Sequence, residues 1–423
     1  MNTAIREFFT GRNWLYHPVT VALIAIAAAC VVGLALAVLA GATLSQTISS
    51  MIEGMVGTPY AIGESMNTAA VLILSAAGFT IAFRAGLVNV GGEGQLVAGG
   101  IAAAAVGTSL SPGVPALLAI PAVLAAATVA GWLWAAIAAF LRVKRGVSEI
   151  ITTLLLNFVA LAHLRLMVQE PSLLRQPVTS AETLPQSAPL VESTHLPLLG
   201  IEGSSATLAI ILALIVVVAV GIVLQRTEIG LKLRSVGLSP TASSRLGIPI
   251  GRYMFQSLSM AGAAAGLAGG ILVATSPFVL AEGFTSGYGF TGLVVGLLAR
   301  GSMLAVIAVS ALLALLTSGG INLQIVAGVP SSTVAVVTGL IMVFIAGAAI
   351  LGTSGGKHRR VRAKPGDPQI DLTPGESTDK LTPARTPGEP GSDVPSGAPA
   401  SPSEPAPRLT KQQPAVDQGG GPR

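Results

Sequence analysis

Ionisable and amide side chains are rare in the long apolar stretches of this chain, so the few that lie there are the first candidates for chemistry. They gather in two places, near 89–95 and near 149–165. A polar group that faces lipid costs free energy, so we expect these groups to face neighbouring helices or a water-filled cavity. The candidates to line a path for a polar solute are Asn89, Glu93, Gln95, Thr152, Thr153, Asn157, His163 and Arg165.

The second cluster has helical spacing. Asn157 follows Thr153 by four residues and Glu149 by eight, which places the three on roughly one helix face. Hydrogen bonding between helices is the alternative role for Asn157 and the threonines.

No spacing of residues predicts a catalytic or metal site. The four histidines are scattered without a metal-binding pattern, and the single cysteine, Cys30, lies inside an apolar run. The fragment SGGKH at 354–358 lacks the glycine spacing of a phosphate-binding loop and the Ser or Thr after its lysine. We therefore expect a protein that is not an enzyme and binds no cofactor or metal, so that any ATP it uses is hydrolysed by another chain.

The stretch GLVNVGGEGQ at 86–95 interrupts two apolar runs and must position the first cluster. Its glycines and Glu93 do not suit a continuous helix that faces lipid, because irregular backbone in a membrane needs protein or water around it. Two interpretations are open. One is a turn between two spans with Glu93 at the interface, and the other is a broken helix beside a transport path.

Composition indicates the kind of protein that carries these residues. Hydrophobic residues make up 52% of the chain, charged residues 10%, and the mean hydropathy is +0.74. A soluble protein of this length does not need so much apolar surface, whereas a bundle of helices in lipid does. The net charge of +5 does not predict nucleic-acid binding, because the basic residues lie at helix ends and in the tail. We predict an all-α polytopic membrane protein.

Apolar runs of spanning length predict about ten transmembrane segments. The first competes with a secretory signal peptide, but its 22 residues exceed the ~7–15-residue apolar core of such peptides, which favours an uncleaved span. The segments lie near 19–40, 67–84, 87–108, 116–141, 148–168, 206–224, 253–275, 286–299, 303–318 and 332–351.

The charges of the connections predict the orientation. If residues 1–18 are cytoplasmic, the outer connections hold only Arg165 and Arg175, and both termini lie inside. The loop at 225–252 is then inside and the loop at 169–205 outside. Five spans followed by five of opposite sense also predict an inverted repeat. The inner positions hold Arg84, Arg142, Lys144, Arg145, Arg226, Lys232, Arg234, Arg245, Arg252 and Arg300.

The predicted membrane domain covers 19–353, and the composition changes after it. Residues 354–423 are rich in Pro, Gly, Ser and Thr, so they cannot bury a core and we expect a disordered cytoplasmic tail. The basic run 357–364 at its start is expected to meet anionic headgroups of membrane lipid.

Two motifs resemble the permease subunits of bacterial ABC importers for simple sugars and nucleosides. GLVNVGGEGQ at 86–95 is similar to the family signature, with Val90 where the nucleoside branch usually has isoleucine. EIITTLLLNF at 149–158 resembles a second motif of the same branch. The resemblance runs from roughly 67 to 351 and implies the fold of a type II-like ABC importer permease.

The inner loop 225–252 gains a role from this resemblance. Its residues alone predict a short helix over 239–246, with Ser239 as N-cap and Pro240 at the first position, or else an ordinary basic loop. In the family this loop docks on the ATPase. The matching residues are Gly230, Leu231, Leu233, Arg234, Val236, Gly237, Pro240, Ala242, Gly247 and Ile248.

The resemblance implies a permease subunit in a bacterial plasma membrane that imports nucleosides by alternating access. It implies three kinds of partner, namely ABC ATPase subunits, a second permease subunit in a homo- or heterodimer, and an external substrate-binding lipoprotein. Phe158 is one of few aromatic side chains that could stack on a base, with packing as its alternative role. A ribose-like sugar permease and a secondary transporter coupled to protons through Glu93 are the alternative functions.

Overall fold

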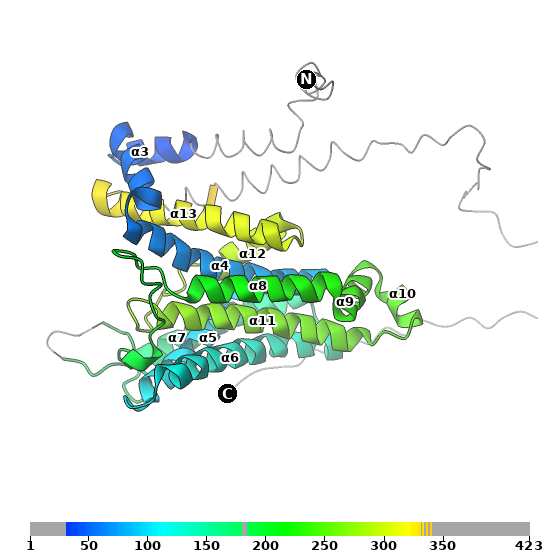
Figure 1. The fold of residues 1–423 in the computed structure, drawn as a ribbon. Coiled ribbons are helices and arrows are strands. Elements are labelled where there is room, and N and C mark those ends of the chain that lie inside the picture. The colour runs from blue at the N-terminus through cyan, green and yellow to red at the C-terminus, as the bar shows by residue number, and fades with distance from the viewer. Residues whose placement is uncertain (1–30, 180–183, 331, 334–335, 337–338, 341–423) are drawn as a thin grey trace, which may run out of the picture. The chain divides into compact units, whose positions relative to one another are not determined.

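The structure, a computed structural model, describes residues 31–179, 184–330, 332–333, 336 and 339–340 (Figure 1). The segment 1–18, most of the predicted spans 19–40 and 332–351, and the tail 354–423 lie outside the described residues. Within the described part the fold is helical, as predicted, and β-pairing is limited to isolated bridges in the connections.

The described helices follow one another with short connections, apart from the long segment between α7 and α8. After the helix Val31–Leu39 they are α3 (Leu44–Ile52), α4 (Pro59–Arg84), α5 (Gly92–Ser109), α6 (Ala116–Arg145), α7 (Glu149–Gln169), α8 (Ala209–Arg226), α9 (Glu228–Leu238), α10 (Pro240–Arg245), α11 (Ile250–Ala274), α12 (Tyr288–Ala299) and α13 (Met303–Ala327).

Helices cover each predicted span from 67–84 to 303–318, but three boundaries differ. α13 continues to Ala327, nine residues beyond the predicted end at 318. α4 begins at Pro59 with Thr58 as its N-cap, so Glu64 lies inside this helix and not in an outer connection. α5 begins at Gly92, because 85–91 is not helical. The predicted break is thus confirmed for 86–91, whereas 92–95 form the first turn of α5. α3 fills a stretch for which the sequence analysis predicts no helix, although the capping box of Thr43 and Gln46 marks its start.

Six described helices, α4, α6, α7, α8, α11 and α13, are long and apolar enough to cross a membrane. The helix Val31–Leu39 and the segment Leu44–Gly57 form one further span if they are taken together, with a bend of 120° between them. α12 is apolar but shorter. Helices of this length and composition are those of a multi-pass membrane protein.

α4 and α11 are the central helices of the bundle. In the apolar 18-residue stretch of each helix that could cross the membrane, 72% is buried in α4 and 83% in α11, against 22% in each of α6, α7 and α8. The peripheral helices therefore present apolar faces outward, as contact with lipid requires. α11 packs against α4, α5 and α6, while α4 also packs against α8, α12 and α13.

Glycines bring the backbones of α5 and α11 into direct contact. A Cβ atom on Gly269 would lie 1.9 Å from the carbonyl oxygen of Leu96, and one on Gly99 would lie 2.2 Å from that of Gly266. The crossing of α6 and α11 uses glycines in the same way. This close approach is the packing that small residues permit between membrane helices.

The two ends of the bundle differ in composition. α9 and α10 lie at one end, beside the end of α4 and the start of α11 (right in Figure 1). The segments 184–208 and 275–287 lie at the opposite end, where a β-bridge joins Gln186 and Ala281. The basic residues predicted for the inner connections gather at the end that carries α9 and α10. Arg84 contacts Gly237 of α9 and donates to Gly301, next to Arg300, and Val143, beside Arg142 and Lys144, contacts Gly251. Four more lie in α8, α9 and α10, namely Arg226, Lys232, Arg234 and Arg245.

Candidate functional site

The break between α4 and α5 reaches deep into the bundle. α12 lies alongside α4, and Gly289 precedes the end of α12 at Ala299 by ten residues, about 15 Å of helical rise. A Cβ atom on Gly289 would lie 2.2 Å from the backbone nitrogen of Glu93, so the first turn of α5 begins at that depth. The chain from Arg84 to Gly91 therefore travels through the bundle as non-helical backbone.

Two side-chain amides close this break onto the first turn of α5. Asn89 Nδ2 donates to Gln95 Oε1 at 2.9 Å, and Gln95 Nε2 donates to Asn89 Oδ1 at 3.0 Å. The same Asn89 oxygen accepts the N–H of Gly91 at 3.0 Å. Both side chains are buried, where an unpaired polar group costs about 1–3 kcal/mol, so the pair stabilises this backbone shape.

α7 holds the break through the helix face that the sequence predicts. Thr153 Oγ1 accepts the N–H of Val90 at 3.3 Å. Asn157 Nδ2 donates to the carbonyl of Val90 at 2.9 Å, and Asn157 Oδ1 accepts the N–H of Gly94 at 2.9 Å. A Cβ atom on Gly94 would lie 2.9 Å from that oxygen, so glycine is needed for this contact.

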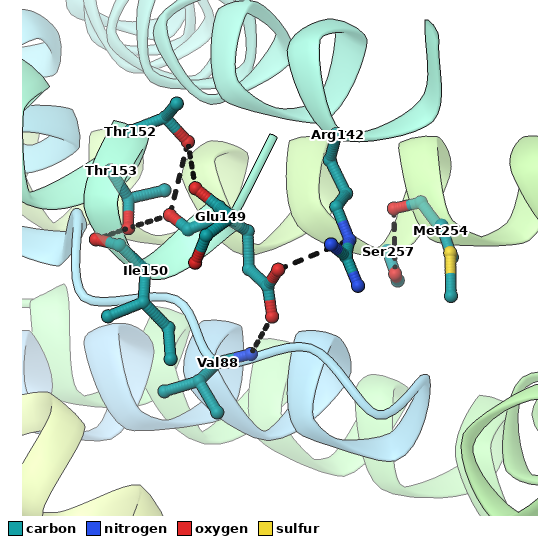
Figure 2. Close-up of polar contacts among 9 residues, drawn as sticks. Val88, Arg142, Glu149, Ile150, Thr152, Thr153, Met254 and Ser257 are labelled. Carbon is teal, nitrogen blue, oxygen red and sulfur yellow. Dashed lines mark hydrogen bonds and ion pairs between the residues drawn. The ribbon is translucent and has the colours of Figure 1, made fainter. Parts of the chain in front are cut away.

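Glu149, in the first turn of α7, holds the start of the break (Figure 2). Its Oε1 accepts the N–H of Val88 at 3.4 Å, and its Oε2 lies 3.2 Å from Nε of Arg142 on α6. The Glu149 side chain is 9% exposed and that of Arg142 34%, so the ion pair lies at the edge of the bundle. One carboxylate thus joins α6, α7 and the break.

Glu93 ties α5 to the segment that precedes α12. Its Oε2 accepts the N–H of Gly289 at 2.9 Å, and its Oε1 accepts the hydroxyl of Thr285. Gly289 lies in the first turn of α12, where unpaired N–H groups and the helix dipole favour a negative charge. Glu93 is 4% exposed, so both carboxylate oxygens are bound inside the protein.

The structure gathers most of the predicted path residues around the break but not all of them. Phe158 lies apart, 64% exposed on the outer face of α7. His163 and Arg165 lie further along α7, and Arg165 pairs with Glu282 at 3.4 Å. The residues gathered around the break, whose hydrogen bonds join separate segments of the chain, are Asn89, Glu93, Gln95, Thr153 and Asn157.

The loop 225–252 holds two helices. Ser239 begins α10, because its hydroxyl accepts the N–H of Ala242 at 3.3 Å with Pro240 at the first position, and the predicted short helix is confirmed. α9 is not predicted from the sequence. The sequence nevertheless contains a signal for the start of α9, because Thr227 is a residue type common at N-caps. Its Oγ1 accepts the N–H of Gly230 at 3.4 Å.

Gly237 seats α9 on the start of the break. A Cβ atom there would lie 2.4 Å from the carbonyl oxygen of Arg84 and 2.9 Å from the nitrogen of Gly86. Arg84 donates from Nη2 to the carbonyl of Gly301, just beyond α12, at 2.8 Å. α9 therefore touches the backbone that leads directly to Glu93.

The predicted coupling residues fall into two groups. Gly230, Leu233 and Gly237 lie toward the bundle, and the exposed ones are Arg234, Pro240, Ala242 and Gly247. The exposed side of α9 also carries Glu228, which accepts a hydrogen bond from Lys232 at 3.0 Å, and this bond lowers the pKa of the Glu228 carboxyl. The exposed side of α9 and α10 thus combines these polar residues with exposed hydrophobic side chains, and it is open to a partner. The hydrophobic ones are Ile229, Leu231, Leu238 and Leu246.

Comparison with known proteins decides the family. Residues 61–346 match the family model described as branched-chain amino acid transport system / permease component. The chain belongs to this permease family. Members are transport components, and the apolar helices of this permease make it a multi-pass membrane protein.

Three curated relatives cover most of the permease. The guanosine ABC transporter permease protein NupP of Bacillus subtilis is 31% identical over 80% of this chain and 96% of its own. The nucleoside ABC transporter permease protein NupB of Lactococcus lactis is 31% identical over 73% of this chain and 85% of its own. The glucose ABC transporter permease protein TsgB13 of Haloferax volcanii is 34% identical over 68% of this chain and 76% of its own. No solved structure matches the permease significantly.

The permease also has a cavity that the sequence does not reveal. Its volume is about 420 Å³, within the range of about 300–1,000 Å³ that small-molecule sites span. It lies at the end of the bundle opposite α9 and α10, between α4, the segment 195–207 and the segment 272–288. Because three distant segments build it, no local motif predicts it. Its polar and aromatic lining includes Glu64, Thr68, His195, Phe284, Ser286 and Tyr288.

The walls of this cavity are fixed by polar contacts. Asn67 Nδ2 donates to the carbonyl of Ser205 at 2.8 Å, and Asn67 Oδ1 accepts the N–H of Thr207 at 3.0 Å. The ring of His195 stacks on that of Phe278 with centroids 3.7 Å apart. The segments that line the cavity are therefore bound to α4 and to each other.

Proposed function

We propose that this chain is the membrane-spanning subunit of an ABC importer that moves nucleosides into the cell by alternating access. The observation that carries this proposal is the similarity to a guanosine permease over nearly its whole length. A second nucleoside permease among the relatives supports the same substrate class. A simple sugar is the alternative substrate, which the similarity to a glucose permease supports.

The proposal includes partners. ABC ATPase subunits bind the exposed side of α9 and α10 and hydrolyse the ATP. A second permease subunit, identical or different, completes the membrane part. An external substrate-binding lipoprotein delivers the nucleoside at the opposite end of the bundle, where the cavity lies. The first partner is supported by the exposed surface of α10, which lies beside a helix that contacts the break.

The contacts suggest how closure of the ATPases moves the membrane part. A displacement of α9 acts at Gly237 on the backbone near Gly86, because these two glycines are in contact. The break that follows leads into the first turn of α5, which contains Glu93. The carboxylate of Glu93 binds Thr285 and Gly289, the residues next to Ser286 and Tyr288 of the cavity. One continuous set of contacts thus joins the surface for the ATPase to the cavity wall.

The arrangement of Glu93 favours this proposal over a proton-coupled secondary transporter. A carboxylate that carries protons needs contact with water or with a path that leads to it. Both oxygens of Glu93 instead accept hydrogen bonds from protein donors, and Glu93 is not among the residues that line the cavity. Glu93 therefore serves better as a tie between helices than as a proton carrier.

We also propose ten spans in a five-plus-five inverted repeat, with both termini in the cytoplasm. Two breaks support the repeat, because α4 and α5 are separated by 85–91 while α11 and α12 are separated by 275–287, near opposite ends of the bundle. The basic residues at the end that carries α9 and α10 support the orientation.

Single cysteines test this orientation. Ser172 in the segment 169–205 and Ser244 in α10 are both exposed, so each accepts a cysteine without repacking. In a Cys30→Ser background, we expect an impermeant thiol reagent to label Ser172→Cys in intact cells and Ser244→Cys only after the cells are opened. Labelling of both from outside would contradict the proposed topology.

Breaking α10 tests the coupling role. Ala242→Pro removes the N–H that donates to Ser239 and disfavours helical geometry at Thr241, whereas the spans keep their internal hydrogen bonds. We expect normal expression and an ATP-dependent nucleoside uptake lowered at least about 10-fold in proteoliposomes that contain the ATPase and the receptor. This loss corresponds to about 1.4 kcal/mol of coupling free energy.

The matched control for this experiment is Ala242→Ser, which keeps the backbone N–H at the same exposed position. We expect its uptake and its association with the ATPase to equal those of the wild type. Wild-type uptake that needs no ATPase and follows the proton gradient would overturn the proposed function.

A further inference from the structure

The cavity contains a carboxylate without a partner. Glu64 lies in the second turn of α4 and lines the cavity, yet it makes no hydrogen bond or ion pair with any residue that the structure describes. Glu93, Glu149 and Glu282, in contrast, all have partners. Glu64 is half-buried, and an ionisable side chain within a helix of membrane-spanning length is by default a candidate for a functional site.

Aromatic rings line the cavity together with this carboxylate. Phe278 has one face covered by His195, since the two rings are nearly parallel, at 10°. Phe284 and Tyr288 lie on the segment 284–288, and both line the cavity. Aromatic faces of this kind are the surfaces on which nucleobases stack in other proteins.

The charge of the lining narrows the class of ligand. Glu64 is the acidic residue in it, and no lysine or arginine is among the residues that line the cavity. A phosphate group would meet this carboxylate without a compensating cation, and like charges at short range repel each other. The cavity therefore suits a neutral ligand that carries hydrogen-bond donors and a flat ring.

We propose that this cavity binds a nucleoside during transport, with Glu64 accepting hydrogen bonds from the two vicinal hydroxyls of ribose and the base lying against Phe284 and Tyr288. A carboxylate paired with ribose hydroxyls is a common solution in nucleotide-binding proteins. This site assignment rests on the proposed function and deepens it, because it makes the permease itself select ribonucleosides and reject nucleotides.

The test compares guanosine with 2′-deoxyguanosine in proteoliposomes that contain the complete transporter. Glu64→Gln is expected to raise the KM for guanosine about 10-fold or more, because the neutral amide has one oxygen to accept a ribose hydroxyl where the carboxylate has two. The KM for 2′-deoxyguanosine, which has only one of the two vicinal hydroxyls, is expected to rise much less. Glu64→Asp keeps the charge on a shorter side chain, and its KM for guanosine is expected to lie between those of the wild type and Glu64→Gln. Guanosine 5′-monophosphate is not expected to compete with guanosine in the wild type. The same substrate-binding lipoprotein is used with every permease variant. Any preference of that lipoprotein for one nucleoside is therefore the same in the wild type and in the variants.

Glu202→Gln is the matched control, because Glu202 is an exposed carboxylate in the same part of the molecule and does not line the cavity. We expect its KM for both nucleosides to equal the wild-type values. An equal KM in wild type and Glu64→Gln, or an equal rise for both nucleosides, would overturn the site. A wild-type transporter that imports no nucleoside would instead overturn the proposed function, so the two failures are distinguishable.

Discussion

Replacement of Gly269 by alanine is expected to lower the melting temperature of the permease by about 10 °C, and replacement by valine to leave almost no folded protein. The reason is the contact of α11 with α5, where a Cβ atom would lie 1.9 Å from the carbonyl oxygen of Leu96 and 2.8 Å from its carbon. These are backbone atoms, so no side chain can turn away to make room. α5 and α11 must therefore separate along their crossing, where Gly99 and Gly266 are also in contact.

The expected magnitude follows from overpacking. Extra atoms in a packed core cost about 1–3 kcal/mol or more, and about 3 kcal/mol corresponds to roughly 6–12 °C for a domain of 150–250 residues. Size-exclusion chromatography in detergent and a thermal scan measure the loss. Gly113→Ala is the matched control, because a Cβ atom on Gly113 would contact nothing within 4 Å. A melting temperature of Gly269→Ala within about 2 °C of the control would contradict the packing argument.

The sequence predicts the break between α4 and α5 because its cause is local. The glycines of 86–95 and a charged residue cannot continue an apolar helix, and the structure begins α5 at Gly92. The spacing of Thr153 and Asn157 predicts one helix face for the same reason, and both side chains bind the break. Helix periodicity and backbone chemistry are properties of neighbouring residues, so a sequence reveals them.

The partners of these residues are not local, and here sequence reasoning stops. Glu93 binds Thr285 and Gly289 across separations of 192 and 196 residues. The cavity is built from three distant segments, and Glu64 looks like a loop residue until α4 is seen to begin at Pro59. The role proposed for Glu64 rests on the absence of a hydrogen-bond or ion-pair partner among the described residues, and only the folded arrangement reveals this absence.

Removal of the Glu93 side chain is expected to lower nucleoside uptake at least about 10-fold and to destabilise the membrane part. In Glu93→Ala the N–H of Gly289 and the hydroxyl of Thr285 lose their acceptor inside the bundle. A buried donor left without a partner costs about 1–3 kcal/mol, and about 1.4 kcal/mol is a factor of ten in an equilibrium constant. Uptake in proteoliposomes and the melting temperature of the purified complex measure the two effects.

Glu93→Gln separates a tie between helices from a proton carrier. The amide oxygen can still accept the N–H of Gly289, and the amide N–H₂ can donate to the hydroxyl of Thr285, which also accepts hydrogen bonds. The variant loses the interaction of the negative charge with the start of α12, which contributes about 0.3–1 kcal/mol. Because this loss is small, we expect Glu93→Gln to keep more than about half of the wild-type uptake. The exposed Glu202→Ala is expected to match the wild type. A proton carrier requires a group that titrates, so complete loss of uptake in Glu93→Gln with an unchanged melting temperature would favour the secondary transporter over the ATP-driven permease.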